Sequence, residues 1–181
     1  YAVKTVTDPN APPNAGLFRP IKVSSTPGSI LSATSPAAVN GRTNTCQRVV
    51  DLVHGALAQA VPDKIIAACN GAVVSTTFSG INPQTGEFYV YLETLGGGFG
   101  ARATKDGLDG VHVHITNTSN LPIEGLEMEY PLRVERYELV KDSGGCGKWR
   151  GGMGLRRMIR IIGHDCRVDA RGTRRLTAPW G

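Results

Sequence analysis

Apolar side chains recur three and four positions apart in one stretch of the chain, residues 44–61. This spacing predicts one long amphipathic helix. Asn44, with Gln47 three positions later, matches a capping box, and Pro62 is expected to end the helix. The apolar stripe consists of Cys46, Val49, Val50, Val53, Leu57 and Ala60. The side chains expected to point away from it are Arg48, Asp51 and His54, with His54 on the surface.

The rest of the chain after this helix has the pattern of β-strands. Residues 72–78 and 88–94 are rich in β-branched and aromatic side chains, and the Pro and Gly residues between them predict a hairpin loop over 81–87. Apolar and polar residues alternate over 111–115, which predicts another strand. Further strands are expected at 132–139, 155–162 and 166–170.

Residues 1–40 contain six prolines, which break any long helix there. A short strand is expected at 18–23. We therefore expect a single α+β segment over 1–181, with a loop-rich extension (1–40) and a body (41–181). The body should be a β-rich mixed domain with one long helix and several glycine-hinged strands.

Composition narrows the class of protein. Glycine, at 23 of 181 residues, is about twice as frequent as usual but has no G-X-Y period, which excludes collagen and predicts many tight turns. No apolar run is long enough to span a bilayer, and no heptad pattern is sustained. Membrane binding is therefore not expected, and neither is a coiled coil.

The net charge of +5 is concentrated in one region. Residues 141–175 carry ten basic and three acidic side chains, a net charge of +7. Such a stretch could meet phosphates or an acidic partner subunit, or form a solvated strand face. With aromatic residues at 6% and no recognition motif nearby, nucleic-acid binding is not expected.

The four cysteines have no zinc-site or redox-pair spacing, and no signal peptide precedes them. We expect a reduced cytoplasmic protein with buried thiols, in which only Cys146, near Lys148, is a candidate reactive thiol. The chain opens on Tyr1 and closes on Gly181, so we expect a segment of something larger or a processed product.

Two glycine-rich segments resemble nucleotide-binding motifs by their letters alone. Residues 98–103 match the dinucleotide fingerprint, but the glycines and aspartates at 105–110 leave no room for the helix that it needs. Residues 143–154 fail the phosphate-loop pattern at Asp142 and Trp149. The first segment is left with two interpretations: a close backbone approach to an anion or a neighbouring chain, or a tight crossing in a crowded core. The second is expected to be a structural glycine loop between two strands.

His112 and His114 fall on one face of the strand expected at 111–115, roughly 7 Å apart. Such a pair could bind a metal if a third ligand came from elsewhere, or it could be two histidines on a wet strand face. Asn117, Asn120 and Glu124 follow closely and would be its polar company.

Several of these motifs, in the same order along the chain, resemble the hydantoinase B/5-oxoprolinase family. The segments that carry the resemblance are 13–21, 36–39, 43–51, 93–102, 114–124, 130–134, 143–145, 150–152 and 178–181. They correspond to the middle and later part of that family's longer chain, which looks as if it runs on past residue 181. Cys46, where relatives often carry Ser, and His112 beside His114 depart from the family pattern.

The resemblance implies one part of an ATP-dependent hydrolase of cyclic amides such as 5-oxoproline, hydantoins or lactams. In that family ATP and Mg are held by an A-type subunit that phosphorylates the substrate, and the B-type part handles the activated species. The divalent metal ligands of some members lie in an N-terminal B-type region that is absent here. The implied partners are thus an A-type ATP-binding subunit and the missing N-terminal B-type region, in a hetero-oligomer.

Phosphorylating an amide oxygen makes it a good leaving group, and the charge that develops needs N–H groups, Asn or Arg nearby. A His or a carboxylate can orient water as general base. We therefore expect His114 or Glu124 to manage the proton and assign no residue to a metal. The expected substrate- or phosphate-binding side chains are Asn14, Arg19, Asn117 and Asn120.

Two alternatives stay open. The chain could belong to an ATP-dependent carboxylase of the acetone or acetophenone type, with a ketone as substrate. It could instead be a non-catalytic assembly module that binds its partner through the basic stretch at 141–175.

Overall fold

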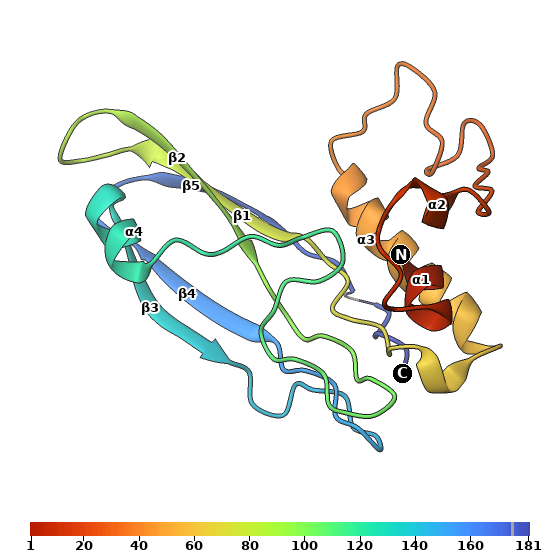
Figure 1. Cartoon of the computed structure of the whole chain (residues 1–181). Helices are drawn as coiled ribbons and strands as arrows, with labels where there is room; N and C mark the ends of the chain where they lie inside the picture. Colours follow the sequence, from red (N-terminus) through yellow and green to blue (C-terminus); the bar gives the residue numbers. More distant parts are fainter. Residues whose placement is uncertain (175) are drawn as a thin grey trace.

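The fold is α+β, as the sequence predicts, with the helices of the first third of the chain gathered at one end, and the β-strands together with one further helix at the other (Figure 1). The computed structural model describes residues 1–174 and 176–181. The helices are α1 (Ala2–Thr7), α2 (Ala15–Phe18), α3 (Arg42–Ala58), the single 3-10 turn η1 (Pro62–Lys64) and α4 (Ile123–Glu129). No helix in this described part is long and apolar enough to cross a membrane.

Two antiparallel sheets form the β end. The first has the order β2-β1-β5 and the second is the pair β3-β4. The strands are β1 (Val74–Ile81), β2 (Phe88–Leu95), β3 (Leu132–Leu139), β4 (Leu155–Ile161) and β5 (Cys166–Arg171). All five strands were predicted from the sequence, with ends shifted by a few residues.

The β1–β2 hairpin is confirmed together with its loop. Val74 pairs with Leu95 and Ile81 with Phe88, so the register is fixed by the turn at 82–87. In that turn the backbone N–H of Gly86 donates to the carbonyl of Asn82. Along β2, alternate residues are buried, as a strand with one face on a core requires.

The apolar core lies between the two sheets and is closed at one end by α4. Burying these side chains supplies the main driving force for pairing the sheets. The buried residues of this core are Phe78, Tyr89, Tyr91, Leu126 and Leu132. Because three of the five come from the β1–β2 hairpin and the other two from α4 and β3, the sheets fold as one unit.

The long helix exists, but it packs the opposite way to our prediction. Its buried side chains are the polar Gln47, Asp51 and His54, whereas Leu52 and Val53 are exposed, Val53 being part of the apolar stripe. His54 is thus buried and not on the surface. The predicted cap is also wrong: Gly41 precedes the helix, and the side chain of Asn44 accepts a hydrogen bond from the N–H of Val73. The polar face turns inward because it meets loop backbone groups that need hydrogen-bond partners.

Residues 111–115 are not a strand. They make one isolated bridge, from Val111 to Gly97, and His114 has a φ of 57°. His112 and His114 therefore do not share a strand face, and the alternation of apolar residues here reflects a loop. The strand expected at 18–23 is also absent, because Phe18 ends α2 and no strand follows it before β1.

Several backbone segments cross in close contact between the helical end and the sheets, with glycine at the crossing points. A Cβ atom on Gly98 would lie 2.0 Å from the carbonyl oxygen of Gly152, and one on Gly100 would lie 1.8 Å from that of Ala67. Only glycine permits such an approach. No helix follows residues 98–103 before α4. A tight crossing, one of our two interpretations, is therefore what the first glycine segment forms.

Besides the apolar core, a buried ion pair links the two sheets. Arg157 of β4 places Nε 3.1 Å from Oε2 of Glu93 of β2, and both side chains are almost fully buried. The guanidinium also lies 4.6 Å from the ring centre of Tyr137. The N–H groups of Arg157 find no well-aligned hydrogen-bond partner in the described chain. The contact with Glu93 is therefore a buried ion pair without a regular hydrogen bond.

We predict that Arg157→Ala destabilises the fold by about 3–5 kcal/mol, because it leaves the carboxylate of Glu93 buried without a counter-charge. The neighbouring Arg156 pairs with Glu138 on the surface, so Arg156→Ala should cost under about 1 kcal/mol. Urea unfolding of both variants measures the difference. Equal losses would contradict the role given to burial.

Candidate functional site

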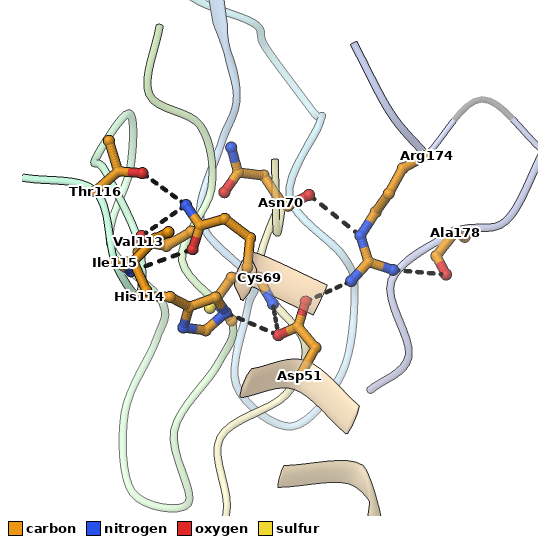
Figure 2. Close-up of polar contacts among 11 residues, drawn as sticks. Asp51, Cys69, Asn70, Val113, His114, Ile115, Thr116, Arg174 and Ala178 are labelled. Carbon is orange, nitrogen blue, oxygen red and sulfur yellow. Dashed lines mark hydrogen bonds and ion pairs between the residues drawn. The ribbon is translucent and has the colours of Figure 1, made fainter. Parts of the chain in front are cut away.

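The carboxylate of Asp51 is the centre of a buried polar cluster where the helical end meets the loops (Figure 2). Its Oδ1 accepts a hydrogen bond of 2.9 Å from Nε2 of His114. Its Oδ2 accepts one of 2.6 Å from Nη2 of Arg174. The side chains of Asp51 and His114 are only 6% and 4% exposed, so solvent screens these contacts little.

The cluster keeps Asp51 ionised. Burial by itself raises the pKa of this carboxyl group, but the hydrogen bond from His114 and the charges of His114 and Arg174 outweigh it. The pKa therefore lies below its ordinary value. With Nε2 of His114 bonded to Asp51, Nδ1 is the ring nitrogen that is turned away from the carboxylate. Figure 2 shows no hydrogen bond from that nitrogen to any of the other residues drawn.

The loop that carries His114 is held by one glutamine of α3. Nε2 of Gln47 donates to the carbonyl of Val113 at 3.0 Å and to Oγ1 of Thr116 at 2.7 Å. Its Oε1 accepts from the N–H of Ile115 at 3.2 Å. These three bonds account for the left-handed backbone of His114, which would be strained if it stood alone.

Arg174 brings the last part of the chain to the same cluster. Besides Asp51, its guanidinium donates to the carbonyl of Asn70 at 3.1 Å and to that of Ala178 at 3.3 Å. One arginine thus joins α3, the segment before β1 and the C-terminal residues. Removing its charge would leave the buried carboxylate of Asp51 with His114 as its main side-chain partner.

Cys69 completes the set of possible metal ligands. Its Sγ, a carboxylate oxygen of Asp51 and a ring nitrogen of His114 lie within 4.8 Å of one another. However, Oδ2 of Asp51 already has the positive charge of Arg174, and Sγ accepts the N–H of Gly100 at 3.3 Å. Burial raises the pKa of Cys69 to about 11, so the thiol is protonated at neutral pH. The cluster fits a buried ion-pair network better than a metal centre, and Cys69 is no nucleophile here.

A cavity of about 510 Å³ adjoins the cluster. Cys69 and Asn70 form part of its wall, and the glycine loops at 98–102 and 143–154 form most of the rest. The network around Asp51 therefore lies directly behind one wall of this hollow. Cys146, the candidate reactive thiol, is exposed at this cavity.

Of the six site residues that we predicted, only His114 belongs to this cluster. Asn14 caps the short helix α2 through a bond from Gly16, and Arg19 is exposed just after that helix. Asn117 is exposed on the loop after His114. The six residues thus do not converge on one cavity.

The remaining two lie toward the β end. Asn120 donates to Oε1 of Glu93 at 2.9 Å and accepts from the hydroxyl of Tyr137 at 2.8 Å, so the fold itself uses its amide. Glu124 is exposed on α4, at the end of the molecule opposite α3 (Figure 1). It is far from His114, with which we had grouped it.

The sequence held a signal for the cluster that we did not use. Gln47, Asp51 and His54 are four and three positions apart, which is the spacing of one helix face. A polar face of this kind, on a helix with an apolar stripe elsewhere, indicates a buried network. Arg174 and Cys69 give no comparable signal, because only the tertiary fold brings them to Asp51.

The basic stretch at 141–175 is largely neutralised within the described chain; Arg175 lies outside the described residues. Six of its arginines form ion pairs with carboxylates of several elements. The pairs are Arg150–Asp109, Arg156–Glu138, Arg157–Glu93, Arg160–Glu135, Arg167–Asp169 and Arg174–Asp51. The stretch is therefore less of a free cationic surface than its sequence suggests.

Known proteins resemble this chain along its whole length. The profile of the family described as Hydantoinase B/oxoprolinase matches residues 1–181. The B-type polypeptide of a putative D-/L-hydantoinase from Pseudomonas sp. is 39% identical over 95% of this chain and 28% of that protein. The 5-oxoprolinase 1 of Arabidopsis thaliana is 35% identical over 100% of this chain and 13% of that protein. The chain thus spans less than a third of these relatives.

Among solved structures, nucleotide-free acetone carboxylase superposes with a TM-score of 0.48 and 21% identity. The match covers 62% of this chain and 15% of that one. At this level the likeness carries no information about function.

We predict that His54 makes the stability depend on pH. Burial, followed by the charge of His114, lowers the pKa of His54 below its usual value of about 6.5. Below that value the unfolded chain binds the proton more readily, so stability falls as the pH drops. His54→Phe should flatten the plot of unfolding free energy against pH between about 7.5 and 5. Burial lowers the pKa of His112 as well, which should leave a residual slope. Parallel plots for parent and variant would contradict the prediction.

Proposed function

The chain belongs to the hydantoinase B/oxoprolinase family, and we propose that it works as part of an ATP-dependent enzyme that opens cyclic amides. In this proposal the segment helps to handle the substrate after a partner subunit has phosphorylated it. The match to the B-type polypeptide of a hydantoinase supports an A-type partner. In our proposal, this partner binds ATP and Mg. The region that would precede this segment would hold any divalent metal.

One geometric observation carries the proposal. A buried His–Asp pair, His114 with Asp51, lies directly behind the wall of a hollow lined by glycine loops. Backbone N–H groups of such loops can face the charge that develops when a phosphorylated amide is attacked by water. A histidine whose tautomer is fixed by a carboxylate is suited to take the proton of that water.

We assign the proton transfer to His114 and not to Glu124. Asp51 orients the imidazole of His114, whereas Glu124 is exposed on α4 far from the cavity. The side chain of His114 is almost fully enclosed here. In the assembled enzyme, its second ring nitrogen would reach the substrate through the neighbouring region or by a small shift of the loop at 111–118.

We propose supporting roles for the other predicted residues. Asn117 is exposed on the His114 loop and is free to contact a substrate. Asn120 donates a hydrogen bond to Glu93, so its role would be to position Glu93. Asn14 and Arg19 belong to the N-terminal extension and would contribute only if a partner brings substrate there.

We predict that His114→Gln and Asp51→Asn each lower ring opening by about 10²–10⁴-fold in the assembly with the A-type subunit. The reason is loss of the general base in one case and of its orientation in the other. Ring-opened product and ADP are measured together, with oxoproline, hydantoin and lactam substrates. ATP binding by the partner should not change.

His112→Gln and Glu124→Gln are the matched controls, and both should retain most of the activity. Loss of ring opening only in Glu124→Gln would move the proton transfer to that residue. Unchanged turnover in all four variants would leave the chain a non-catalytic assembly module. Bicarbonate-dependent ATP use with a ketone, and none with cyclic amides, would replace the hydrolase by a carboxylase.

A further inference from the structure

We propose that the cavity between the two glycine loops binds a small oxyanion-bearing molecule with a flat ring, held by Lys148 and Arg102 and packed against Trp149 and Trp180. This deepens the proposed function, on which it rests only for the identity of the ring. The cavity has a volume of about 510 Å³, enough for a ligand of this size.

The charge of the cavity wall is the first argument. Lys148 and Arg102 line it, and no Asp or Glu side chain does so among the residues that the structure describes, although the carboxylate of Gly181 lies in the same wall. Neither cation lies within ion-pair distance of a carboxylate in that part of the chain. This contrasts with the arginines of the 141–175 stretch, six of which are paired. Two unneutralised cations on one hollow favour an anionic occupant.

The nearest acidic residues are used elsewhere. Asp109 binds the guanidinium of Arg150 at 2.9 Å and accepts the N–H of Met153 at 2.7 Å. Asp106 accepts the backbone N–H of Arg150 at 2.7 Å. These bonds tie the loop at 143–154 to the segment at 106–109, and neither aspartate is among the residues that line the cavity. The cations of the cavity wall therefore face no neutralising carboxylate from this segment.

Hydrogen bonds to the backbone fix the guanidinium of Arg102. Its Nε and Nη2 donate to the carbonyl of Asp106 at 3.2 and 2.6 Å. This bond fixes the plane of the guanidinium without cancelling its charge, and Nη1 makes no bond within the described chain. A planar guanidinium that is fixed in this way loses little entropy when it binds a carboxylate or phosphate.

The indole rings supply the second argument. Trp149 and Trp180 both line the cavity, and each is only partly exposed, at 37% and 36%. Phe99 adds a third aromatic side chain. The indole of Trp180 also lies against Gly55 of α3. Aromatic side chains beside cations fit a flat ring that carries an anionic group, whereas a bare inorganic ion would use the cations alone.

The oxyanion could come from the substrate itself, as the carboxylate of a ring such as 5-oxoproline, or from a phosphoryl group on the activated ring. Both have the chemistry that Lys148 and Arg102 recognise. Binding experiments on the chain can separate the two sources, and they do not depend on whether the assembled enzyme turns over.

The test uses the fluorescence of the 181-residue chain, because its two tryptophans are both in the cavity wall. The chain is titrated at fixed ionic strength with 5-oxoproline, inorganic phosphate and 2-pyrrolidinone, the last being the same ring without a carboxylate. We expect a saturable change with 5-oxoproline and a weaker or no response to 2-pyrrolidinone. Saturation by phosphate as well, with competition between the two, would identify the phosphoryl group as a second source.

Lys148→Gln should weaken binding of 5-oxoproline by at least about tenfold, the loss expected for one charge-assisted contact. Lys141→Gln is the matched control, since Lys141 precedes the same loop but does not line the cavity. Three results would overturn the proposal: no saturable response to either anion, equal binding of the neutral ring, or equal effects of the two lysine variants. Failure here with normal turnover in the assembly would remove this site and leave the proposed function intact.

Discussion

A charge can be buried in a protein interior only if its surroundings replace the water that it loses. Asp51 meets this condition with an imidazole N–H, a guanidinium and a backbone N–H, contributed by the His114 loop, by Arg174 and by Cys69. These partners lie 18 to 123 positions away along the chain. Satisfying one carboxylate therefore fixes where the long helix, the loop and the C-terminal residues lie relative to one another.

The elements that could be predicted are those decided by neighbours in sequence. The β1–β2 hairpin follows from residues that alternate locally and from a turn that closes within six residues, so its register needs no distant information. The position of α3 follows from its periodicity in the same way. Its orientation does not, because the burying face was assigned by hydrophobicity, and the environment of Asp51 is polar. Which face of α3 is buried depends on the segments that pack against the helix, and not on the helix sequence alone.

The same limit applies to the site. The sequence identifies His114 as a histidine in polar company. The alternation around it predicts a strand, but these residues belong to a loop that Gln47 holds in place. Asn120 and Glu124 follow in the sequence and were grouped with it, although one is bound inside the fold and the other is exposed at its far end. Proximity along a chain places side chains together only where the backbone is regular.

The glycine crossings join the cavity wall to the segment that carries Cys69 and Asn70. A Cβ atom on Gly98 or Gly100 would lie no more than 2.0 Å from the backbone of the crossing segment. The crossing segments are therefore packed so closely that one cannot move without the other. A ligand that pulls the 143–154 loop inward must therefore displace the segment that carries Cys69 and Asn70, and with it the carbonyl on which Arg174 rests. The wall of the hollow and the carboxylate of Asp51 thus share one set of closely packed backbone segments.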